Sequence, residues 1–132
     1  MTSTNTQTIR EIYEHWAQGD FRAGPEHFDP SVVFVMRPEF PDAGTYLGPD
    51  QVAEYMRGFL AAWNHATIEA TEIIEAGDSV VAAVTQRALG TASGIETELR
   101  YFHAWSFRGQ TIIRLESIMA REEALAVVGL QA

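Results

Sequence analysis

The chain has 132 residues, 46% of them hydrophobic, which suffices for one domain with a packed core and a modest cavity. Its 18 acidic and 9 basic residues give a net charge of −9, which repels nucleic-acid phosphates and anionic lipid, so we expect no nucleic-acid and no membrane partner. Cysteine and lysine are both absent, which excludes disulfides, thiolate nucleophiles and Schiff-base lysines.

The sequence shows no membrane-spanning or targeting segment. It has no run of about 18 apolar residues, which a spanning helix needs. The first residues, MTSTNTQT, are polar and lack the charged-then-apolar order of a signal peptide. We therefore expect a cytoplasmic protein. No repeat or linker divides the chain, so we predict a single domain over residues 1–132.

The first part of the chain predicts a helix followed by a strand. A helix over 8–20 is indicated by apolar residues at helical spacing, which are Ile9, Ile12, Tyr13 and Trp16. Gly19 is a natural end for this helix. A short helical turn within 21–30 is closed by Pro30, and the β-branched segment 31–36 reads as a strand.

A turn and a second helix are predicted over 45–63, with Pro49 in the first helical turn. Its expected buried face consists of Val52, Tyr55, Met56, Phe59, Leu60 and Trp63. The rest of the chain is strand-like, with glycine turns between the segments 67–76, 79–90, 95–108 and 111–119, and a short helix over 121–130.

This order, helices first and then a four-strand antiparallel meander, is typical of the α+β class. A strongly curved antiparallel or mixed sheet wrapped around the N-terminal helices would form a cone with an apolar interior. In the segment RYFHAWSFRGQ, residues 100–110, strand alternation puts Tyr101, His103, Trp105 and Phe107 on one face. His103 is the only polar member of that aromatic face.

Four segments carry a further pattern by their order and spacing: AQGDF at 17–21, FDPSVVF at 28–34, TYLGPDQVAEYM at 45–56, and the hairpin and tail at 105–130. Together they resemble the SnoaL-like polyketide cyclase and ketosteroid isomerase group of the nuclear transport factor 2-like superfamily. The family's usual Asp-Gly-Lys turn is replaced here by the residues at 108–111. The resemblance covers nearly the whole chain and implies a conical α+β barrel that forms a homodimer through the outer face of its sheet and uses no cofactor.

The resemblance also implies a cavity for a small hydrophobic molecule between the concave sheet and the helices. The residues expected to line it are Tyr13, Trp16, Phe34, Met36, Tyr55, Phe59, Trp63, Tyr101, Trp105, Leu115 and Met119, together with His103 and Ser117.

Steroid isomerases of this group use a carboxylate base, a tyrosine and a neutral carboxylic acid. The resemblance places these three roles on Met36, Ile12 and His103, so we do not expect the steroid-isomerase mechanism. The catalytic aspartate of the polyketide cyclases falls on Ser117. His103 and Ser117 are therefore the candidate catalytic residues, facing inward from neighbouring strands. The alternative is a core histidine whose hydrogen bonding is satisfied by a hydroxyl.

The remaining polar residues are assigned by strand alternation and position. Glu116 is expected on the outer face of the sheet. Only one of the neighbours Gln86 and Arg87 can face inward; Arg87 is expected to point outward, and the alternative is an inward Arg87 that binds a substrate carboxylate or pairs with a buried acid. The loop 37–44, with its acidic Glu39 and Asp42, is interpreted as a surface loop at the cavity mouth, with a flexible lid as the alternative. Metal-ligand spacing is not shown by the other histidines, His15, His27 and His65, so we expect no metal site.

The expected function is binding of a small hydrophobic, oxygenated ligand of polyketide, steroid or terpenoid type. One hypothesis is an isomerase, cyclase or hydrolase that uses His103 as general acid and base or as the hydrogen-bond donor to a developing enolate, with Tyr13, Tyr55 and Ser117 assisting. The other is a non-enzymatic ligand-binding or dimerisation module with a filled or sequestering cavity, and the absence of an inward carboxylate pair favours it.

Overall fold

The computed structural model describes residues 3–130. Three helices and six strands, with one short helical turn, follow one another along the chain. In order they are α1 (Thr4–Trp16), the turn η1 (Pro25–His27), β1 (Phe28–Met36), β2 (Gly44–Leu47), α2 (Gly48–Ala62), β3 (Trp63–Ala76), β4 (Ser79–Gly90), β5 (Glu96–Arg108), β6 (Thr111–Ile118) and α3 (Arg121–Val127).

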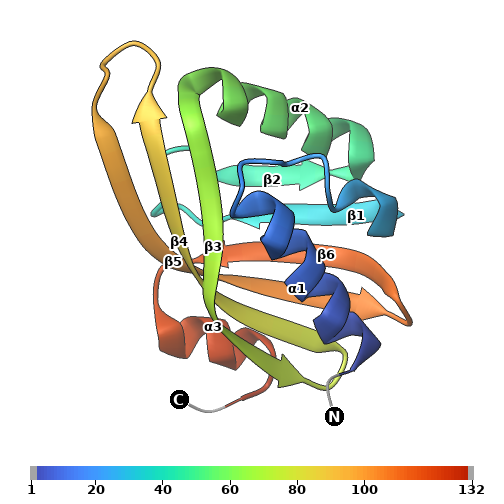
Figure 1. Cartoon of the computed structure of the whole chain (residues 1–132). Helices are drawn as coiled ribbons and strands as arrows, with labels where there is room; N and C mark the ends of the chain where they lie inside the picture. Colours follow the sequence, from blue (N-terminus) through green and yellow to red (C-terminus); the bar gives the residue numbers. More distant parts are fainter. Residues whose placement is uncertain (1–2, 131–132) are drawn as a thin grey trace.

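The six strands form one mixed sheet in the order β2-β1-β6-β5-β4-β3. β1 pairs in parallel with β6, and the other neighbouring strands are antiparallel. The sheet curves so that α1 and α2 lie on its hollow side, while α3 packs on the other side against β5 and β6 (Figure 1). The predicted α+β cone is confirmed, although the sheet is not closed, because β2 and β3 form its two edges.

The predicted meander corresponds to β3, β4, β5 and β6, whereas the prediction of a turn before the second helix was wrong. Residues Gly44–Leu47 form the short strand β2, antiparallel to the end of β1. A strand of four residues is too short to show a repeating pattern in the sequence.

The first helix buries the predicted stripe. Ile9, Ile12, Tyr13 and Trp16 are all at most 5% exposed and belong to the main core. Gly19 follows the helix with a φ of +82°, a left-handed conformation that glycine adopts without strain. The chain can therefore turn sharply there and leave α1 against β3.

The buried face predicted for the second helix is only partly observed. Val52 is buried, but Leu60 is 43% exposed. Tyr55, Phe59 and Trp63 are only half-buried, because they face a cavity and not a packed core. Apolar spacing on a helix identifies the inward face, but it does not distinguish packed side chains from cavity walls.

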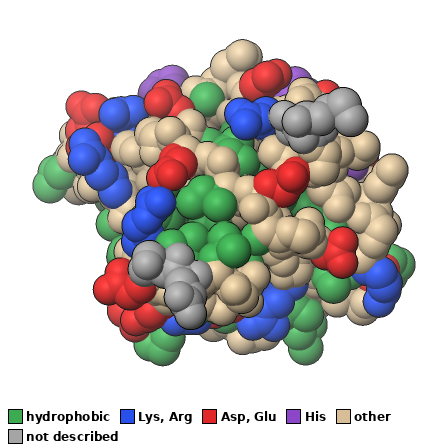
Figure 2. All heavy atoms as spheres, turned by 90° about the horizontal axis from the view of Figure 1, so that it is seen from below, with side chains coloured by type: hydrophobic (Ala, Val, Ile, Leu, Met, Phe, Trp, Pro, Cys, Tyr) green, Lys and Arg blue, Asp and Glu red, His purple; other side chains and the backbone are tan. Residues whose placement is uncertain are grey.

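The outer side of the sheet carries a second, smaller apolar cluster under α3, formed by Val81, Ala104, Ile118 and Ala124. Hydrophobic side chains gather near the middle of the molecular face that is seen from below, with charged side chains around them (Figure 2). Within residues 3–130, no helix is long and apolar enough to cross a membrane.

Glu116 points to this outer side, as predicted, but it is not a solvent residue. It is only 6% exposed and accepts hydrogen bonds from Arg37, at 2.6 Å, and Arg114, at 3.1 Å. These arginines hold its pKa below the ordinary value against the opposing effect of burial. Arg37 also pairs with Glu123 of α3, which fixes the start of the loop that follows β1.

Candidate functional site

The aromatic face of β5 is oriented as the alternation predicts. Tyr101, His103, Trp105 and Phe107 are each at most 4% exposed and lie on the hollow side of the sheet. The outward-facing Arg108 at the end of the strand is exposed. His103 is therefore a buried polar side chain, and its hydrogen-bond partners decide what it can do.

A chain of hydrogen bonds runs from Trp105 through Tyr13 to His103. The indole Nε1 of Trp105 donates to the Tyr13 hydroxyl at 2.8 Å, and this hydroxyl lies 2.7 Å from Nδ1 of His103. Because indole nitrogen can only donate, the Tyr13 oxygen is the acceptor in the first bond, and its own proton is free for Nδ1. The arrangement that satisfies Trp105 Nε1, the Tyr13 hydroxyl and His103 Nδ1 has Nδ1 as acceptor, which puts the ring proton on Nε2.

Aromatic side chains surround His103 and determine its charge. Burial lowers its pKa to about 3, so the imidazole is neutral at physiological pH. The Tyr101 ring stands edge-on at 5.1 Å, and the Tyr13 ring lies nearly parallel at 5.9 Å. Burial also raises the pKa of Tyr13, which keeps its hydroxyl protonated as a donor. A neutral imidazole in this setting is a poor proton acceptor but a good hydrogen-bond donor through Nε2.

The predicted His103–Ser117 pair is adjacent but not hydrogen-bonded. The two residues are direct partners across β5 and β6, and both are buried. Among residues 3–130 the only hydrogen bond recorded for the His103 ring is the one to Tyr13. Ser117 thus has no base positioned to activate it, and the arrangement gives no support to a nucleophilic serine.

A small recess of about 30 Å³ lies beside His103 and Ser117. This volume is enough for one water-sized group. Five residues of the recess wall also line a much larger cavity: Met36, Tyr55, Phe59, Gln86 and Tyr101. His103 thus lies behind the shared wall and not on the large cavity itself.

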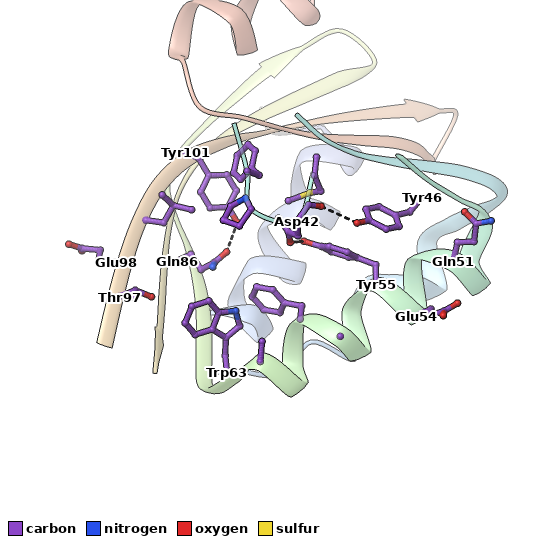
Figure 3. A pocket seen from close by; sticks show the side chains of 17 residues that line it. Asp42, Tyr46, Gln51, Glu54, Tyr55, Trp63, Gln86, Thr97, Glu98 and Tyr101 are labelled. Atoms are coloured by element: carbon purple, nitrogen blue, oxygen red, sulfur yellow. Dashed lines mark hydrogen bonds between the residues drawn. The ribbon is translucent and has the colours of Figure 1, made fainter. Parts of the chain in front are cut away.

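The large cavity has a volume of about 870 Å³ and lies between α2, the loop after β1, and β4 and β5 (Figure 3). This is the size of a site for a small organic ligand. Six aromatic side chains line it, which are Phe40, Tyr46, Tyr55, Phe59, Trp63 and Tyr101. Three acidic residues also belong to its wall, Asp42, Glu54 and Glu98, and no basic residue is present among its described wall residues. The side chain of Glu98 points away from the cavity and pairs with Arg87 on the outer side of the sheet (Figure 3).

Asp42 is a polar wall residue that the sequence interpretation placed in a loop at the cavity mouth but gave no role. Its carboxylate accepts a hydrogen bond from the Tyr55 hydroxyl, and its backbone oxygen accepts one from Tyr46 at 3.0 Å (Figure 3). Phe40 of the same loop is 4% exposed and packs edge-on against Tyr101, at 5.2 Å between ring centroids. The loop 37–44 was expected at the cavity mouth as a plain surface loop; it does border the cavity, but the plain-surface interpretation was wrong because Phe40 and Asp42 form part of the wall.

Gln86 and Arg87 are oriented as predicted. Gln86 lines the cavity, where its amide oxygen accepts a hydrogen bond from Tyr101 at 2.8 Å and its amide nitrogen remains available to a ligand. Arg87 points outward, is 51% exposed in its side chain, and pairs with Glu98 at 3.0 Å.

The predicted lining residues divide into three groups. The large cavity is lined by Met36, Tyr55, Phe59, Trp63 and Tyr101. The recess wall alone contains Trp16, Phe34, His103, Leu115 and Ser117. The third group, Tyr13, Trp105 and Met119, was predicted to line the cavity but belongs to the walls of neither space. Tyr13 and Trp105 are buried in the main core, and Met119 is partly buried and packs against that core.

Metal ligands are not clustered in the described part of the chain. No group of three histidine or acidic side chains there is arranged to hold an ion. His15 lies beside Asp20 on the surface, and His27 beside Glu26, each as a single pair.

An α+β cone with an aromatic cavity under α2 is the arrangement of a small ligand-binding domain. A family model described as the SnoaL-like domain matches residues 9–115, and the chain belongs to this family. Curated proteins give no match.

Solved structures share the fold at low sequence identity. A nuclear transport factor 2-like protein of unknown function from Burkholderia pseudomallei is 24% identical with a TM-score of 0.79, covering 97% of this chain and 99% of its own. TerC, co-crystallised with polyporic acid, is 22% identical with a TM-score of 0.76, covering 96% and 98%. A hypothetical protein with a ketosteroid isomerase-like fold from Catenulispora acidiphila, in complex with trimethylamine, is 16% identical with a TM-score of 0.75, covering 96% and 95%.

Proposed function

We propose that this protein binds a small hydrophobic, oxygenated molecule of polyketide, steroid or terpenoid type. The apolar body of the ligand would lie in the large cavity, and a ligand oxygen would enter the recess and accept a hydrogen bond from His103 Nε2. The observation that carries the proposal is a buried, neutral imidazole whose second ring nitrogen has no hydrogen-bond partner among residues 3–130 and which borders a recess adjoining an aromatic cavity. TerC was crystallised with polyporic acid, which supports a ligand of this general size.

The role that fits His103 is hydrogen-bond donation to a carbonyl or enolate oxygen. Because its pKa is about 3, the His103 ring is uncharged at neutral pH and its only ring proton is the one on Nε2. General acid and base catalysis by His103 is therefore not supported. An enzymatic form of the proposal is an isomerase or cyclase in which His103 polarises the ligand carbonyl. The alternative is a module that binds the same ligand without turnover. Homodimerisation and a cytoplasmic location stay predictions.

Ketone and hydrocarbon pairs with the same rings test the proposal. We expect alpha-tetralone to bind more tightly than tetralin, and beta-decalone more tightly than decalin, by about three- to tenfold, because only the ketone accepts the His103 hydrogen bond. His103→Phe should abolish this difference and leave hydrocarbon binding nearly unchanged. Calorimetric titration gives the affinities, and a rise in Tm confirms binding to the native state.

Two further variants make the test specific. His103→Gln retains a neutral donor and should keep part of the ketone preference, whereas Ser117→Ala should leave it intact. Equal affinity for ketone and hydrocarbon in the unmodified protein would refute the role of His103. Failure of all four compounds to bind would refute the cavity as a hydrophobic site. Product formation during the titration would separate an enzyme from a binding module.

A further inference from the structure

The charged residues of the large cavity are all acidic. Its described wall residues include the acidic Asp42, Glu54 and Glu98 and no arginine, lysine or histidine, although the carboxylate of Glu98 is turned to the outer side of the sheet. Glu98 has arginine partners outside the cavity, Arg87 at 3.0 Å and Arg100 at 3.9 Å. Among residues 3–130, neither Asp42 nor Glu54 lies within ion-pair distance of a basic side chain.

Asp42 is the best placed of the three carboxylates. It is only partly exposed, whereas Glu54 is exposed and the side chain of Glu98 is exposed on the outer side of the sheet. Its one side-chain hydrogen bond comes from Tyr55, a neutral donor, which leaves the other carboxylate oxygen available. Burial and the neighbouring carboxylate raise the pKa of Tyr55, so this phenol stays protonated and neutralises no charge.

Aromatic faces stand beside the carboxylate. The rings of Tyr46 and Tyr55 are 4.6 Å apart between centroids, and both hydroxyls reach Asp42 (Figure 3). The remaining wall adds Phe40, Phe59 and Trp63. A carboxylate among aromatic faces attracts a cation both by direct charge and by the negative faces of the rings.

We infer that the ligand carries a positive charge, as a hydrophobic amine or quaternary ammonium whose cationic group lies between Asp42 and the rings of Tyr46 and Tyr55. This inference rests on the proposed function, because it assigns the charge of the ligand that occupies the same cavity. The amine end would lie at Asp42 and the oxygenated end at the recess. Ligands with a carboxylate or phosphate are disfavoured, because the wall offers them no basic partner. The net charge of −9 adds a general attraction for cations.

A series of tetralin derivatives that differ in charge alone tests the inference. We expect beta-aminotetralin to bind about tenfold more tightly than beta-methyltetralin, its neutral analogue, and the beta-tetralin carboxylate to bind most weakly. Asp42→Asn should remove most of the advantage of the amine and leave the affinity for beta-methyltetralin unchanged. The asparagine oxygen can still accept the Tyr55 hydrogen bond, so the loop should keep its place.

A matched control separates the local charge from the net charge. Glu11→Gln removes one exposed carboxylate of α1, outside the cavity, and should leave the preference for the amine intact. Three outcomes would overturn the inference. The amine and its neutral analogue could bind equally, the carboxylate could bind best, or Glu11→Gln could lose as much of the amine preference as Asp42→Asn. If alpha-tetralone still binds in that case, the proposed function survives. If no tetralin derivative binds, both fail.

Discussion

Replacing Tyr13 by phenylalanine is expected to lower the free energy of unfolding by about 2–4 kcal/mol, although only one oxygen atom is lost. The Tyr13 hydroxyl joins two otherwise unpaired groups, the Trp105 indole and the His103 imidazole, and all three side chains are at most 3% exposed. Each group left unsatisfied in the core costs about 1–3 kcal/mol, because water cannot replace the missing partner. Urea denaturation followed by Trp fluorescence measures the change.

Tyr46→Phe is the matched control for this prediction. It also removes one hydroxyl, but that hydroxyl donates to a single loop carbonyl on a partly exposed residue. We expect it to cost about 1 kcal/mol or less. Equal effects of Tyr13→Phe and Tyr46→Phe would show that the buried chain contributes nothing special. In that case the Tyr13 hydrogen bond to Nδ1 could no longer be used to assign the His103 ring proton to Nε2.

Stability is expected to fall as the pH is lowered from about 6.5 towards 5, because of His103. The folded protein holds its pKa at about 3, whereas the ordinary value is 6.5. Between these values the unfolded chain binds one more proton than the folded one, so stability rises with pH and is lost on acidification. The expected slope approaches 1.4 kcal/mol per pH unit well below pH 6.5. Denaturation at a series of pH values gives this slope.

The upper part of this window, from about pH 5.5 to 6.5, reports mainly on the histidine. The carboxylates with lowered pKa, such as Glu72, Glu75 and Glu116, have ordinary values of 4.5, so they also favour the folded state and begin to lose this effect at about pH 5. His103→Gln keeps a neutral hydrogen-bonding side chain and should flatten the slope in this window. An unchanged slope in that variant would mean that His103 titrates normally in the fold.

The sequence predicts the strands and their inward faces better than it predicts the site. Alternation along 100–110 placed His103 correctly, because a strand with one buried face allows only one register. The helical spacing of Ile9, Ile12, Tyr13 and Trp16 was equally decisive for α1. Resemblance placed the family's tyrosine on Ile12, yet it is Tyr13 whose hydroxyl reaches His103. A shift of one residue on a helix turns a side chain by about 100°, which weak sequence similarity does not resolve.

The role of Asp42 could not be found from the sequence, which showed it only in a loop at the cavity mouth. It lies in a loop without periodicity, and the contacts that turn it into the cavity come from Tyr46 on β2 and Tyr55 on α2. The sequence showed β2 only as a turn. Phe40 is the signal that was available, since a phenylalanine between two prolines in a surface loop has to pack somewhere. With Asp42 on the wall, the cavity has a carboxylate that the sequence interpretation had not oriented inward.

The most direct test of the account is the state of the two His103 ring nitrogens, measured by nitrogen–proton correlation NMR before and after saturation with alpha-tetralone or beta-decalone. We predict a neutral ring with its proton on Nε2 throughout the neutral pH range. The Nε2 signal should move when the ketone binds, while Nδ1, held by Tyr13, should change little. A proton on Nδ1, or an Nε2 signal that stays in place while the ketone saturates the cavity, would contradict the account.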